Sequence, residues 1–136
     1  MSFGTTLEQA ILNAWFGGTA PSLPANLFFG LSTTTISNSA APTEPVGNAY
    51  ARVSVTNNTT NFPAATGNTP ATKRNANPIT FPASTGSWGN CTDGFVADAS
   101  SGGNVLGFGP LGSPINVTGA GFTISFAANA VTIQEN

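Results

Sequence analysis

Clusters of glycine, proline and asparagine interrupt this chain at intervals of about ten residues, and they constrain its fold more than any other feature. Only short apolar segments stand between the clusters, and strands of roughly four to eight residues fit there whereas helices of ordinary length do not. The alternation of apolar and polar side chains is clearest in residues 50–56 and 122–126. This spacing is typical of an all-β fold, and we expect a single-domain antiparallel β-sandwich of jelly-roll type.

The sandwich is expected to span residues 19–136 and to contain roughly seven to nine short strands. The expected strands are 27–35, 50–56, 78–82, 92–99, 105–109, 115–118, 122–126 and 130–133. Long loops are expected at 37–48 and 64–77, and a turn between two prolines at 110–114. Because prolines bound residues 78–82, that strand is expected at a sheet edge or a strand end.

One short helix is expected in residues 1–18, ahead of the sandwich. Thr5 or Thr6 can cap its start, and the pair Gly17-Gly18 ends it. An apolar stripe with the spacing i, i+3, i+4, i+7 and i+8 consists of Leu7, Ala10, Ile11, Ala14 and Trp15. A helix of about three turns is not stable alone in water. We expect it to dock on its own sheet, and docking on a neighbouring subunit is the alternative.

Charged side chains are scarce, at 6% of the residues, whereas about a quarter is usual in a soluble domain. Three basic residues and a net charge of −2 argue against nucleic acid, since phosphate binding draws on several Lys or Arg contacts. A surface this neutral is typical of a protein packed against its own copies or a partner, so we expect a homo-oligomer, and a soluble monomer with a hydroxyl-rich surface is the alternative. The sequence contains no run of about 18 apolar residues, so we expect no membrane-spanning helix. The first residues do not resemble a secretory signal, which predicts synthesis in a cytoplasm.

Residues suited to catalysis or metal binding are equally scarce. The chain has no histidine and one cysteine, Cys91, which excludes Cys–His zinc sites within one chain and histidine-based catalysis. We expect Cys91 to be buried and inert. Asp93 and Asp98 stand on one expected strand at a spacing that directs them to opposite faces, and we expect both to be solvated. We therefore predict no enzymatic activity, no catalytic residue, no cofactor and no bound metal.

Several short motifs follow one another along nearly the whole chain in a characteristic order. They are residues 15–20 (Trp-Phe-Gly-Gly-Thr-Ala), 27–34 (Leu-Phe-Phe-Gly-Leu-Ser-Thr-Thr), 44–45, 50–58, 79–82, 85–89, 98–99 and 102–106. In this order they resemble a family of small virion proteins of tailed bacteriophages, often labelled phage tail fibre proteins. The resemblance implies a structural role in the particle, and localisation in the virion after synthesis in the host cell cytoplasm.

Size and composition favour a compact knob over a rod, because the repeats of a fibre shaft are missing. We therefore predict a capsid decoration or cement protein, a trimer that bridges copies of the major capsid protein. The expected contact residues are Leu7, Ile11, Trp15 and Phe16 of the helix and Pro42, Glu44 and Pro45 of the 37–48 loop. The alternative is a tail fibre or baseplate accessory protein that contacts the host surface. In that case Trp88, Tyr50 or Trp15 could stack on sugars, although such aromatics more often fill a core or anchor an interface.

Overall fold

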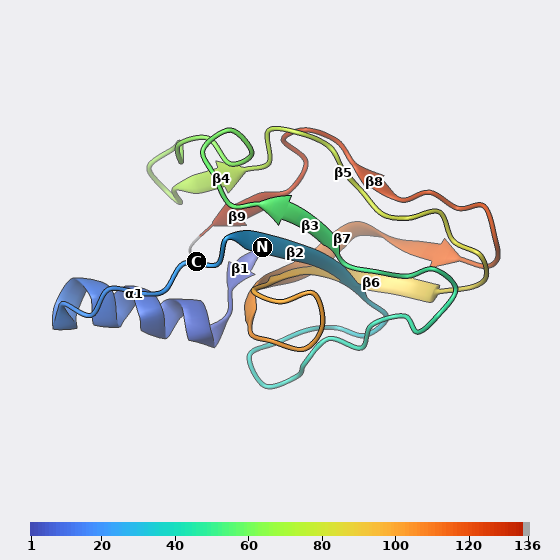
Figure 1. The fold of residues 1–136 in the computed structure, drawn as a ribbon, viewed down its shortest axis with the longest axis horizontal. Helices are drawn as coiled ribbons and strands as arrows, with labels where there is room; N and C mark the ends of the chain where they lie inside the picture. The colour runs from blue at the N-terminus through green and yellow to red at the C-terminus, as the bar shows by residue number, and fades with distance from the viewer. Residues whose placement is uncertain (135–136) are drawn as a thin grey trace.

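A five-stranded antiparallel sheet, with strand order β1-β7-β6-β2-β3, forms the larger layer of the fold (Figure 1). The computed structural model describes residues 1–134. Their elements are β1 (Ser2–Phe3), α1 (Thr5–Gly17), β2 (Asn26–Ser32), β3 (Val53–Thr56), β4 (Thr72–Arg74), β5 (Ile79–Thr80), β6 (Gly89–Ala97), β7 (Val105–Val117), β8 (Ser125–Phe126) and β9 (Thr132–Gln134). The chain is therefore mostly β with one short helix near its start, as the sequence predicts.

Two short ribbons, β4–β9 and β5–β8, form the second layer (Figure 1). Leu27, Phe29 and Leu31 alternate along β2 on the face toward these ribbons, because alternate residues of a strand share a face. The ribbons and the loops beside them contribute the facing side chains Phe62, Ile79, Phe81, Trp88, Ile124, Phe126 and Val131. Apolar side chains thus fill the space between two antiparallel layers, and the prediction of an all-β sandwich is confirmed.

The opposite face of the large sheet is covered by residues 33–45, which we call the flap. Gly30 and Phe95 are register partners on this face, and a Cβ atom at position 30 would collide with the Phe95 ring. Ile36 of the flap packs on Phe95 and Ala97, and all three are buried. Part of the segment expected as an exposed loop is therefore an ordered cover for the sheet.

Two buried polar side chains fasten the flap to the sheet. Asp93 accepts a hydrogen bond on Oδ2 from the backbone N–H of Ile36 at 3.2 Å, and Ser32 Oγ accepts one from the N–H of Thr43 at 2.9 Å. Asp93 is 3% exposed, so the expectation that it is solvated is wrong. The buried N–H of the flap requires an acceptor, and a carboxylate on the sheet supplies it.

The expected turn at 110–114 is instead part of β7, which continues to Val117. The register passes from Asp93↔Pro110 to Cys91↔Ile115, so residues 111–114 of β7 stand opposite Thr92 alone. The chain bulges there without leaving the strand. Pro110 is tolerated because β1 pairs only with Phe108 and Gly107, which leaves the outer edge of β7 free beyond them.

Three other segments differ from the expected strands. Residues 122–126 contribute only the two-residue strand β8, and the expected loop 64–77 contains β4, which carries no apolar pattern. The strand expected from residue 50 begins at Val53, because Tyr50 and Arg52 turn toward the sheet edge and bind the flap. Backbone pairing and side-chain hydrogen bonds decide these boundaries, and neither leaves a periodic signal in the sequence.

Replacement of Phe81 tests the sandwich core. Phe81 is 2% exposed, and its ring centroid lies 6.3 Å from that of Tyr50 and 6.5 Å from that of Trp88. We predict that Phe81→Ala lowers the free energy of unfolding by about 3–5 kcal/mol, because a cavity replaces a buried ring. Chemical denaturation followed by tryptophan fluorescence measures this. The control Phe122→Ala, at a side chain 40% exposed, should cost clearly less, and equal losses would contradict the proposed core.

Candidate interaction surface

Residues 5–25, which we call the arm, form a projection from the sandwich made of α1 and the connector that returns from it (Figure 1). The arm is tied down at both ends. The N–H of Gly4 donates to the carbonyl of Leu106 at 2.7 Å just before α1. After the connector, Asn57 donates through its side-chain amide to the carbonyl of Pro24 at 3.0 Å and through its N–H to that of Ala25 at 2.9 Å. The arm therefore projects from fixed attachment points.

Backbone groups rather than side chains define the ends of α1. The helix is capped at its start by Gly4, which offers no side-chain hydrogen bond, so the prediction of Thr5 or Thr6 as the cap is wrong. At its end Gly18 adopts φ 66°, and its N–H donates to the carbonyl of Asn13, as the glycine pair predicts. The helix carries one charged side chain, Glu8, and is neither long nor apolar enough to span a membrane.

The apolar side chains at the far end of α1 are exposed. The exposed set is Ile11, Leu12, Trp15 and Phe16, whose spacing of i, i+1, i+4 and i+5 puts them on one face. Trp15 is 80% exposed and Phe16 is 87% exposed. Leu7, Ala10 and Ala14 are only half-buried, and no residue of the helix is fully buried. The expectation that the apolar stripe docks on its own sheet is therefore wrong, because the helix extends beyond the sheet.

Sequence reasoning found Trp15 and Phe16 but missed two neighbours. Leu12 is 57% exposed and Leu23, in the connector, is 76% exposed. Leu12 lies outside the predicted stripe, and Leu23 stands between two prolines that give no helical or strand pattern. The adjacent pair Ile11-Leu12, followed four residues later by Trp15-Phe16, was the available signal for a broad apolar face.

The three contact residues expected in the flap are Pro42, Glu44 and Pro45, and they pack or bond within the fold. Glu44 forms a bidentate ion pair with Arg52, with Nη2–Oε2 at 2.7 Å and Nε–Oε1 at 3.0 Å, and the Arg52 side chain is 5% exposed. Pro45 is buried and Pro42 is half-buried. On this side of the molecule the prominent apolar side chain is that of Val46, which is 90% exposed. A contact role for Pro42, Glu44 and Pro45 stays a prediction.

Arg52 links three segments of the chain. Besides Glu44, its guanidinium donates through Nη1 to the carbonyls of Ala99 at 2.7 Å and Gly102 at 2.9 Å, in the hairpin between β6 and β7. It also lies over the Phe95 ring, with Cζ 4.9 Å from the ring centroid. These contacts engage four of the five N–H donors of a buried cation, and burying a cation requires such partners.

Tyr50 completes this network at the edge of β2. Its hydroxyl donates to Glu44 Oε1 at 2.9 Å and accepts from the N–H of Leu31 at 2.9 Å, beyond the point where β3 stops pairing with β2. Trp88 is 4% exposed and donates through Nε1 to the carbonyl of Asn48. Both aromatics therefore act inside the fold, and of the three considered for sugar stacking only Trp15 is exposed.

Asp93, Asp98 and Cys91 are engaged in hydrogen bonds or buried. Asp98 accepts hydrogen bonds from the backbone and side chain of Asn104 within the β6–β7 hairpin, while Asp93 holds the flap. Cys91 is fully buried, as predicted, and burial raises the pKa of its thiol. Residues 1–134 contain no group of three acidic or cysteine side chains that could hold a metal ion.

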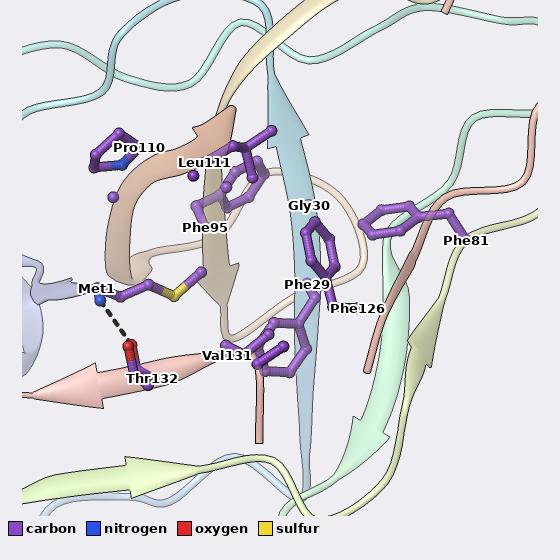
Figure 2. Close-up of a pocket in the computed structure, with 14 residues that line it drawn as sticks. Met1, Phe29, Gly30, Phe81, Phe95, Pro110, Leu111, Phe126, Val131 and Thr132 are labelled. Atoms are coloured by element: carbon purple, nitrogen blue, oxygen red, sulfur yellow. Dashed lines mark hydrogen bonds between the residues drawn. The ribbon is translucent and has the colours of Figure 1, made fainter. Parts of the chain in front are cut away.

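An apolar pocket of about 170 Å³ opens between β7 and the chain that leads into β9 (Figure 2). Buried Phe29, Phe81 and Val131 form its floor, whereas Pro110 and Ala130 at its rim are exposed. Figure 2 shows the Met1 side chain reaching across it, with the Met1 amine donating to the carbonyl of Thr132 at 2.6 Å. The lining includes glycines of β6 and β7, such as Gly94, which leave space where side chains would otherwise stand.

The chain is a β-sandwich that uses Glu44, Arg52 and Asp93 inside the fold and exposes an apolar arm. The model of a family described as podophage GP4 fiber I protein gp80 matches residues 2–134. Because this match covers nearly the whole chain, the chain belongs to that family of phage virion proteins, and the predicted family and virion localisation are confirmed. No curated protein matches the chain.

Removal of the Glu44 carboxylate charge tests the ion pair. We predict that Glu44→Gln lowers the free energy of unfolding by about 2 kcal/mol, because the buried Arg52 guanidinium loses its counter-charge while the amide keeps a similar shape. The matched control is Glu8→Gln on the exposed surface of α1, which should leave the free energy of unfolding unchanged. Equal midpoints of urea denaturation for both variants and the parent chain would contradict the role given to Glu44.

The single tyrosine of the chain gives a spectroscopic test at alkaline pH. Burial, and to a lesser degree the Glu44 carboxylate, raise the pKa of the Tyr50 phenol far above its ordinary value near 10. The unfolded chain ionises near pH 10 while the folded chain does not, so stability is full below that pH and falls as pH rises above it. We predict that phenolate absorbance appears only as the chain unfolds. Phenolate formation near pH 10 in a folded chain would contradict a buried hydroxyl.

Proposed function

We propose that this chain is a non-enzymatic subunit of a fibre-type appendage of a phage particle, held in place by its arm. The observation that carries the proposal is the exposure of Trp15 and Phe16 on α1, in an arm whose two ends are both hydrogen-bonded to the sandwich. Large exposed aromatics are anchors in protein interfaces, where each buries roughly 150–250 Å². Docking of the arm on a neighbouring virion protein would remove this apolar surface from water.

The charge distribution supports a role in assembly. Glu44, Arg52 and Asp93 are used inside the fold, which leaves a surface rich in neutral side chains. Interfaces are depleted of charge at their centres because desolvating a charge is costly. The involvement of Glu44, Asp93 and Asp98 in structural hydrogen bonds also supports the proposal that the chain is not an enzyme.

The family description favours a fibre-type position over the capsid position that we predicted from size and composition. A capsid decoration or cement protein, bound as a trimer to the major capsid protein, remains the second candidate. It is favoured by the short strands and the two-layer form, because a compact unit of this kind suits a knob on a shell.

Location of the protein on the particle tests the proposal. We predict that antibody-gold labelling of purified phage particles places the protein on appendages of the tail. Labelling spread over the shell would replace the fibre proposal by the capsid decoration reading. Absence of the protein from particles purified through a density gradient would contradict both positions.

A further inference from the structure

The chain carries both an exposed aromatic knob and an apolar pocket, at different places on its surface. The knob is Phe16 at the far end of α1, and the pocket is the one of about 170 Å³ beside β7. We propose that Phe16 of one copy inserts into this pocket of a second copy. This inference rests on the proposed role in the particle and names a partner for the arm, a second copy of the chain.

The size of the pocket matches a phenyl ring. An apolar cavity of about 150 Å³ in another protein is large enough to bind benzene, and the pocket here is slightly larger. Phe16 is the more exposed aromatic of the arm, at 87%, and it stands one residue before the end of α1. The larger indole of Trp15 would then lie at the rim, where Pro110 and Ala130 are exposed.

The chemistry of the two surfaces also agrees. The pocket is lined by aromatic, aliphatic and glycine residues and by Thr132, without any charged side chain. The arm contains Glu8 as its charged residue, on the turn of α1 nearest the sandwich. The charged group at the pocket is the Met1 amine, which already donates to the carbonyl of Thr132 at 2.6 Å, so insertion of Phe16 brings no second charge into the contact. A helix that binds a membrane surface usually carries Lys or Arg, and α1 has neither.

The knob of a given copy does not reach the pocket of the same copy. Gly4 is fixed to Leu106 at the start of α1, and Met1, a residue of the pocket wall, lies on that same side. A helix of 13 residues is about 20 Å long at 1.5 Å per residue. Figure 1 shows α1 extending away from the sandwich, so Phe16 lies at its distant end. The occupant of the pocket is therefore supplied by another copy.

A contact between a knob on one copy and a different site on the next is head-to-tail. Such contacts close into rings or continue into filaments, and each copy uses its arm once and its pocket once. Variants that remove the knob or fill the pocket should consequently be complementary. A pocket-filling change is available at Ala130, which is exposed at the rim, and a second at Gly94, where a Cβ atom would lie 3.4 Å from Leu111, in ordinary contact.

The test is association of the purified full chain, measured by sedimentation velocity over a range of concentrations. We expect the parent chain to form oligomers, and Phe16→Ala, Ala130→Phe and Gly94→Ala each to weaken association, the first by at least about 30-fold, as for an interface hot spot. The control Leu23→Ala, at another exposed apolar residue of the arm, should associate like the parent. A mixture of Phe16→Ala and Ala130→Phe should form dimers and nothing larger, because one knob and one open pocket remain in each pair.

Other occupants would give different results. A parent chain that stays monomeric but binds vesicles of anionic lipid, or binds another virion protein through Phe16, would overturn the inference. Association that survives both pocket variants but not Phe16→Ala would also overturn it, since the arm would then dock elsewhere. The position of the protein on purified particles, measured by antibody-gold labelling, does not depend on these outcomes. Failure of this inference is therefore distinguishable from failure of the proposed function.

Discussion

The ion pair between Glu44 and Arg52 is the interaction on which the arrangement of this fold depends. It joins the flap to the start of β3, and through the carbonyls of Ala99 and Gly102 it reaches the β6–β7 hairpin. The Tyr50 hydroxyl extends the same network to the open edge of β2. Because these groups have few water contacts, each requires the others, and the flap is thereby held over Phe95 and the outer face of the sheet.

A sandwich closed in this way does not need the arm for its core. The two layers bury their own apolar side chains, while α1 leaves Trp15 and Phe16 in water. Exposed aromatic surface of this kind is unfavourable in a free chain and becomes favourable once a partner covers it. The division of the molecule into an internally satisfied body and an apolar arm therefore supports the proposed role in assembly.

The sequence predicted the fold class, the helix, β2, the β6–β7 hairpin and the burial of Cys91, because each has a local apolar pattern or a turn signal. It did not predict the partners of Glu44 and Arg52, since the side chains meet through the fold and not through spacing. The prediction that α1 docks on its own sheet was wrong. An apolar stripe indicates that a surface will be covered, but it does not indicate which surface covers it. No sequence pattern indicated the pocket, because it forms where Gly94 and the other lining residues come together from different segments of the fold.

The central claim is that the arm is held ready for a partner while the sandwich is complete without it. Amide hydrogen exchange, measured by mass spectrometry on the free chain and on purified particles, tests this most directly. We expect amides of α1 to exchange rapidly in the free chain at concentrations where it is monomeric, those of β2 and β6 to be protected, and α1 to gain at least about tenfold protection on the particle. Protection of α1 equal to that of β6 in the free chain, or no change on the particle, would contradict the claim.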